Sequence, residues 1–110
     1  QGGDEQDQLL LQFFLNMVEF NMTVQEACEA PGFITNQMYS SFGDHEKLIG
    51  SLILNEQIPK WIRKDLSNMG YKLSFREKTS GPVNAIYFDR EHGSFWGGSS
   101  NFGEDYGIGW

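Results

Sequence analysis

Cysteine, histidine and proline are scarce in this sequence, and long apolar runs are missing from it. The 110 residues contain one cysteine, two histidines and three prolines. A single cysteine excludes an internal disulfide and a cysteine-based zinc site, and the histidines have no metal-ligand spacing. No run of about eighteen apolar residues occurs, so we expect no membrane-spanning helix. We also expect no metal and no other cofactor.

Basic residues are scarce too. Eight lysines and arginines stand against fifteen acids, which gives a formal net charge of −7. Duplex nucleic acid repels such a chain unless one face is strongly basic. We interpret the local basic run as a solvated helix face and strand edge, and we expect no nucleic-acid partner. The run consists of Lys60, Arg63, Lys64, Lys72, Arg76 and Lys78.

Aromatic residues, by contrast, are plentiful at 15% and supply the core of one small domain. Apolar spacing predicts a helix over Gln6–Phe20 that is buried on more than one side. Thr23 and Glu26 fit a capping box that opens a short helix, in which Cys28 is predicted to be a small core residue. A third helix is predicted over Pro59–Met69. Its expected buried stripe is Ile58, Trp61, Ile62, Leu66 and Met69.

The remaining apolar segments are short and β-like. Strands are predicted over Gln37–Phe42 and Ser51–Asn55, with a helix over Leu48–Leu54 left open as an alternative to the second. A hairpin is predicted over Val83–Asp89 and Ser94–Trp96. The glycine-rich tail, residues 97–110, is expected to be irregular. The order helix, helix, strands, helix, strands predicts an α+β layered architecture with antiparallel pairing.

One glycine pair is a candidate site. Gly2 and Gly3 precede the first predicted helix, where consecutive N–H groups at the positive end of the dipole suit an anion or a developing oxyanion. Two glycines also make an ordinary turn, so both interpretations stay open. Asp4 and Glu5 would oppose an oxyanion. The functional interpretation therefore requires these acids to point away or to bind something else, such as a substrate amine.

The sequence contains no complete catalytic centre. His45 and His92 lie in predicted surface loops, and no serine lies in a nucleophile elbow. The chain has no initiator methionine and opens on Gln1 and two glycines directly before a helix, so we expect a piece of a longer polypeptide. One cysteine fits a reducing cytoplasm, while a periplasmic or extracellular location stays open.

Several motifs resemble a known enzyme family. The segment Asn21–Phe33 contains Gln-Glu-Ala followed by Ala-Pro, and Gly107–Trp110 reads Gly-Ile-Gly-Trp. Together with the glycine pair before a Leu/Phe-rich helix, these motifs resemble the γ-glutamyltransferase family (γ-glutamyltranspeptidase, glutathione hydrolase). The resemblance covers nearly the whole of residues 1–110. It is to the C-terminal portion of the family's small, catalytic subunit, in a divergent branch.

The resemblance implies a fold and a mechanism. The family has the αββα four-layer sandwich of the N-terminal nucleophile hydrolases, and its precursor cleaves itself. The new N-terminal threonine attacks γ-glutamyl amides such as glutathione, and the γ-glutamyl group passes to water or an amino acceptor. That threonine lies upstream of these residues. By resemblance, Gly2 and Gly3 supply backbone donors to the oxyanion, and Asp4 is a candidate for substrate binding.

The resemblance also implies partners. The upstream large-subunit segment and the N-terminal part of the small subunit would complete the site around a small γ-glutamyl substrate, and a higher oligomer stays open. Gly32 stands where the family usually has a basic residue, and 100–103 replaces a common Asp-Pro-Arg-Arg-type stretch. Two alternatives therefore remain. One is an acylase for another amide, such as a β-lactam side chain, and the other is a catalytically inactive relative that acts as a binding unit.

Overall fold

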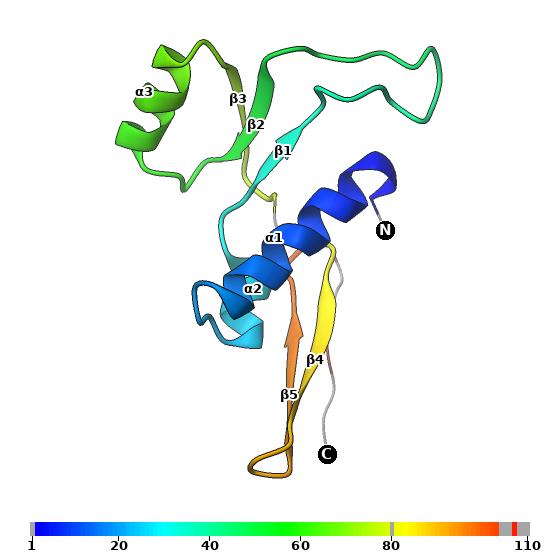
Figure 1. Cartoon of the computed structure of the whole chain (residues 1–110), viewed down its shortest axis with the longest axis vertical. Helices are drawn as coiled ribbons and strands as arrows, with labels where there is room; N and C mark the ends of the chain where they lie inside the picture. Colours follow the sequence, from blue (N-terminus) through cyan, green and yellow to red (C-terminus); the bar gives the residue numbers. More distant parts are fainter. Residues whose placement is uncertain (1, 80, 104–106, 108–110) are drawn as a thin grey trace.

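The computed structural model describes residues 2–79, 81–103 and 107, which form a mixed helix and strand fold (Figure 1). The α+β class expected from the sequence is confirmed. Among the described residues, no helix is long and apolar enough to cross a bilayer. The elements are a 3-10 turn (Gly3–Glu5), α1 (Gln6–Val18), α2 (Val24–Glu29), β1 (Phe33–Thr35), β2 (Ser51–Asn55), α3 (Lys60–Asn68), β3 (Lys72–Arg76), β4 (Asn84–Asp89) and β5 (Ser94–Ser99).

The strands form two separate sheets. Strands β4 and β5 pair antiparallel as the predicted hairpin, with Gly93 at a φ of 65° in the connecting turn. The other sheet has the order β1-β2-β3, in which β1 runs antiparallel to β2. Strand β3 runs parallel to β2, so the expectation of antiparallel pairing is wrong for this pair. Helix α3 supplies the crossover that a parallel pair needs.

The buried core lies between α2 and the hairpin. Thr23 caps α2 as predicted, because its hydroxyl accepts from the N–H of Glu26 and the Glu26 carboxylate accepts from the N–H of Thr23. Helix α2 buries Val24 and Cys28 against Val83. Cys28 is 0% exposed, which confirms it as a core residue, and burial raises the pKa of its thiol.

Helix α1 passes in front of the hairpin and reaches the edge of β1 (Figure 1). Gln12 Oε1 accepts from the N–H of Phe33 at 2.9 Å, and Gln12 Nε2 donates to the Phe33 carbonyl at 2.8 Å. Gln8 bonds in the same way to the N–H and C=O of Thr35, at 2.8 and 3.2 Å. The two amides therefore take the place of a neighbouring strand at the β1 edge.

The expectation that α1 is buried on more than one side is wrong for this chain. Of the described residues of α1, Leu9 alone is buried, while Leu11, Phe14 and Val18 are at least half exposed. Helix α2 and the β1 edge cover only part of the helix circumference. The apolar stripe is wider than these contacts, so the remainder faces solvent.

Helix α3 and its expected buried stripe also need correction. The helix begins at Lys60, with Pro59 as its N-cap, and none of its described residues is buried. Trp61 and Met69 are largely exposed. An apolar cavity of about 650 Å³, lined by residues of β1, β2 and α3 and of the adjoining segments, lies between the helix and the strands.

Two strand predictions are corrected as well. Residues 37–42 form a loop, because turn-forming residues such as Ser40 bond to their own neighbours instead of to a sheet. Strand β5 continues through Gly97 and Gly98 to Ser99, so the start of the tail is regular. The prediction for tail residues 104–106 and 108–110 lies outside the described residues.

Candidate active site

The first glycine pair forms a tight turn into α1. Gly2 and Gly3 have φ values of 135° and 53°, which L side chains rarely adopt. The carbonyl of Gly2 accepts from the N–H of Glu5 at 2.9 Å, and the 3-10 turn runs directly into α1. N–H groups in a first helical turn have no acceptor within their own helix. They lie at the positive end of the helix dipole, where an anion is favoured.

The two acids that follow the glycines have partners on other elements. Asp4 Oδ2 accepts from the backbone N–H of Ser41 at 2.7 Å. Hydrogen bonds from the side chain and the backbone of Ser41 hold the pKa of Asp4 below its usual value. Glu5 Oε1 lies 3.4 Å from Arg76 Nη1 on β3. Both carboxylates therefore bind groups on other elements. This is one of the two arrangements that are compatible with an oxyanion site at the glycines.

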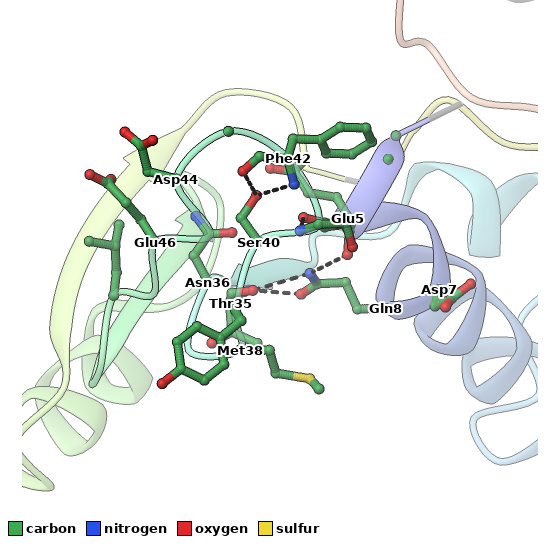
Figure 2. Close-up of a pocket in the computed structure, with 17 residues that line it drawn as sticks. Glu5, Asp7, Gln8, Thr35, Asn36, Met38, Ser40, Phe42, Asp44 and Glu46 are labelled. Atoms are coloured by element: carbon green, nitrogen blue, oxygen red, sulfur yellow. Dashed lines mark hydrogen bonds between the residues drawn. The ribbon is translucent and has the colours of Figure 1, made fainter.

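A cavity of about 810 Å³ opens beside the glycine turn. One side is formed by the turn and the start of α1, and the other by residues 36–48 between β1 and β2, which we call the wall loop (Figure 2). In Figure 1 this loop extends past the N-terminal end of α1. The lining combines acids with large apolar side chains. The acids are Asp4, Glu5, Asp7, Asp44 and Glu46, and the large apolar side chains are Met38, Tyr39, Phe42 and Leu48.

The wall loop is held in shape by its own hydrogen bonds. The N–H of Leu48 donates to the carbonyl of Asn36 at 2.7 Å, and the N–H of Ser40 donates to the carbonyl of Glu46 at 2.9 Å. The Ser40 hydroxyl donates to the carbonyl of Phe42 and accepts from its N–H, both at 3.1 Å, as Figure 2 shows. The loop therefore has a defined turn at the cavity without belonging to a sheet.

The other polar candidates do not meet in one place. His92 Nδ1 lies 2.9 Å from Asp89 Oδ2 in the hairpin turn, and His45 Nδ1 lies 2.8 Å from the carbonyl oxygen of Ser40. Both histidines are exposed, as predicted. Within the described part of the chain, no group of three or more His, Cys, Asp or Glu side chains could hold a metal ion.

Gly2, Gly3 and Asp4, the residues predicted from the sequence, all line this cavity, whereas the wall loop was not predicted as part of it. The run Ser40-Ser41 followed by Gly43-Asp44 between two apolar segments was an available signal for a loop. Nothing in the sequence pattern indicated that this loop bonds to Asp4, because the contact joins residues 37 positions apart.

The family model described as Gamma-glutamyltranspeptidase matches residues 1–110 of the chain. The chain belongs to the gamma-glutamyltranspeptidase family. The resemblance drawn from the motifs is therefore confirmed. A search of the curated proteins found no match.

Solved structures of gamma-glutamyltranspeptidases and of a cephalosporin acylase share the fold. LmbA2991HD has a TM-score of 0.91 and 25% identity, and the match covers 100% of this chain and 20% of that one. An acivicin-inhibited gamma-glutamyltranspeptidase has a TM-score of 0.68 and 26% identity, with 87% and 47% covered. A cephalosporin acylase from Bacillus halodurans has a TM-score of 0.72 and 19% identity, with 94% and 18% covered. This chain spans less than half the length of each.

Proposed function

We propose that this chain is part of a γ-glutamyltransferase-like enzyme. The enzyme would cleave γ-glutamyl amides such as glutathione through a γ-glutamyl-enzyme intermediate and pass the group to water or an amino acceptor. The observation that carries the proposal is the turn at Gly2 and Gly3, which lines a cavity at the start of α1 in a member of the gamma-glutamyltranspeptidase family.

In this proposal the N–H groups of Gly2 and Gly3 stabilise the tetrahedral intermediate. When a nucleophile attacks the amide carbonyl, negative charge develops on its oxygen, and donors already in place stabilise that charge without reorganisation. The dipole of α1 adds partial positive charge at the same end. The nucleophile is a threonine upstream of these residues, and its own α-amine acts as the base.

Asp4 is the second proposed substrate contact. Its carboxylate lines the cavity, and the hydrogen bond from Ser41 engages Oδ2. An ionised carboxylate accepts several hydrogen bonds through two oxygens, so it has capacity for a substrate amine as well. Asp4 is ionised at neutral pH, as a partner of a protonated amine must be, because its ordinary pKa is 3.8 and the hydrogen bonds from Ser41 lower it further.

We also propose that the upstream large-subunit segment and the N-terminal part of the small subunit cover this chain. One side of α1 and one face of the hairpin present large apolar side chains to solvent, and exposed apolar patches mark interaction surfaces. On the hairpin, Phe88 and Phe95 are cross-strand partners with ring centroids 5.0 Å apart. The face that exposes Ile86, Phe88 and Phe95 fits a layered sandwich, in which a second sheet packs onto it.

Two measurements on the native protein that contains this chain test the proposal. Its intact mass and N-terminal sequencing should locate a self-cleavage site followed by threonine. The mature protein should release p-nitroaniline from γ-glutamyl-p-nitroanilide and glutamate from glutathione, and replacing that threonine by alanine should abolish both activities. A protein that is not cleaved and turns over neither substrate would contradict the proposal.

An acylase for another amide is the second candidate. The similarity in fold to the cephalosporin acylase favours it, although that protein shares only 19% identity with this chain. A cephalosporin side-chain amide, assayed beside γ-glutamyl-p-nitroanilide, separates the two functions by the ratio of kcat/KM. A catalytically inactive relative that acts as a binding unit would lack the threonine at the cleavage site.

A further inference from the structure

Phe42 of the wall loop lies directly against the glycine turn. A β-carbon built on Gly3 would lie 3.2 Å from Phe42 Cε2 and 3.8 Å from its Cζ. The residue is nevertheless 68% exposed, so its ring covers the glycine with one edge and presents the rest to the cavity that it lines. The Phe42 ring therefore lies between the glycine turn and the cavity.

Asp4 holds this ring in place through the backbone. Its Oδ2 accepts at 2.7 Å from the N–H of Ser41, the residue directly before Phe42. A hydrogen bond to an ionised acceptor is roughly twice as strong as one between neutral groups. The Ser40 hydroxyl then bonds to both the N–H and the C=O of Phe42. One carboxylate beside the glycine pair thus anchors residues 40–42.

The rest of the wall loop adds apolar surface to the same cavity, beside its two acids Asp44 and Glu46. Met38, Tyr39 and Leu48 line it and are more than half exposed. Lys47 Nζ lies 4.4 Å from the centroid of the Tyr39 ring, a cation–π contact that restrains the ring. Apolar side chains exposed in a cavity favour a ligand that removes them from water.

We propose that the wall loop sets the substrate preference of this enzyme, with Phe42, positioned by Asp4, selecting γ-glutamyl amides of aromatic or bulky apolar amines. The inference rests on the proposed function and names the substrate class. The γ-glutamyl group is polar and charged, so the apolar side chains of the wall loop fit the other side of the amide, which is the amine that leaves. Phe42 touches that amine, whereas Asp4 influences the preference through Ser41.

The kinetic test uses the mature full-length protein with two amides, γ-glutamyl-p-nitroanilide and γ-glutamylmethylamide. Phe42→Ala should lower kcat/KM for the anilide at least tenfold, mainly because KM rises. The same substitution should change kcat/KM for the methylamide by less than threefold. Phe42→Tyr should retain the preference. The matched control is Phe20→Ala, because Phe20 is equally exposed at 67% but follows the other end of α1. The ratio of the two kcat/KM values does not depend on the folded fraction.

Asp4→Asn tests positioning separately. It should reduce the anilide preference in the same direction and accelerate hydrogen–deuterium exchange in peptides covering 36–48. The double variant with Phe42→Ala should be no less selective than Phe42→Ala alone, because Asp4 acts on selectivity through the ring. Unchanged exchange in Asp4→Asn would overturn the positioning role.

An unchanged kcat/KM ratio in Phe42→Ala would overturn the role of the ring. A wild-type protein that cleaves neither amide would contradict the proposed function instead. The equilibrium dissociation constants of the two amides then test Phe42 without turnover. We expect Phe42→Ala to weaken binding of the anilide at least tenfold, and equal constants in wild type and variant would overturn the inference.

Discussion

The chain contains two Gly-Gly pairs, Gly2-Gly3 at the turn before α1 and Gly97-Gly98 in strand β5. At Gly98 the absence of a side chain allows close packing, because a β-carbon would lie 2.6 Å from Val24 Cγ1 and 2.9 Å from the Val24 carbonyl carbon. At Gly2 and Gly3 the backbone has positive φ, and the turn lines a cavity. The same dipeptide thus serves packing in one region and backbone conformation in the other.

Gly98→Val should have the largest effect and should prevent or weaken folding. Overpacking costs about 1–3 kcal/mol where side chains move aside, and a contact with the α2 backbone leaves less room for adjustment. We expect a loss of about 3 kcal/mol or more in the free energy of unfolding of the mature protein, measured in urea. Gly97→Ala is the control, since its β-carbon meets nothing within 4 Å. Equal urea midpoints for Gly98→Val and wild type would contradict the claim that Gly98 is needed for close packing against α2.

Gly3→Val should act on turnover more than on folding. Losing one oxyanion donor costs on the order of 10²–10³ in kcat, and valine is strained at a φ of 53°, so the N–H should rotate out of line. We expect kcat per folded molecule to fall at least tenfold while the melting temperature stays within a few degrees. Normal turnover on the folded fraction, with a lowered melting temperature, would make this pair an ordinary turn.

Sequence patterns predicted the features that depend on neighbours in the chain. The capping box at Thr23, the hairpin and the glycine turn before α1 are all coded within a few residues, and the structure contains them. The parallel pairing of β3 and the contact between Asp4 and Ser41 join distant segments, so no local pattern specified them. Burial of α1 and α3 was overestimated because an apolar stripe predicts a covered face without saying which chain segment covers it.

A third glycine, Gly32, differs from Gly98 because its close neighbour is the end of a flexible side chain and not backbone. A β-carbon there would lie 2.8 Å from Gln12 Oε1, the amide that bonds to Phe33. A side chain at this position would displace that amide. Gln12→Ala should therefore lower the free energy of unfolding by about 1–3 kcal/mol, since it removes both hydrogen bonds to β1. Gln6→Ala, at an exposed position of the same helix, should change it by less than about 0.5 kcal/mol.

Acid should affect the glycine turn at the cavity and leave the packing at Gly98 unchanged. The hydrogen bonds from Ser41 lower the pKa of Asp4 below its usual 3.8. The stabilisation from a carboxylate with a lowered pKa is present above its unfolded value and is lost as pH falls through the folded value. The wall loop should thus stay docked from pH 5 to 8 and loosen only in stronger acid. A carboxyl NMR titration of Asp4 should give a midpoint below 3.8, and a midpoint at or above that value would contradict the contact.

The smallest effect is expected from the basic helix, which contacts neither glycine pair. Lys60 and Lys64 are exposed on α3, and neither lines the cavity beside Gly3. Exposed charges away from special features usually change stability by less than about 0.5 kcal/mol. Reversing both lysines to glutamate should therefore leave the melting temperature and kcat/KM of the mature protein nearly unchanged. A tenfold rise in KM would place this face of α3 in the substrate site. The substrate site would then extend beyond the cavity at Gly2 and Gly3.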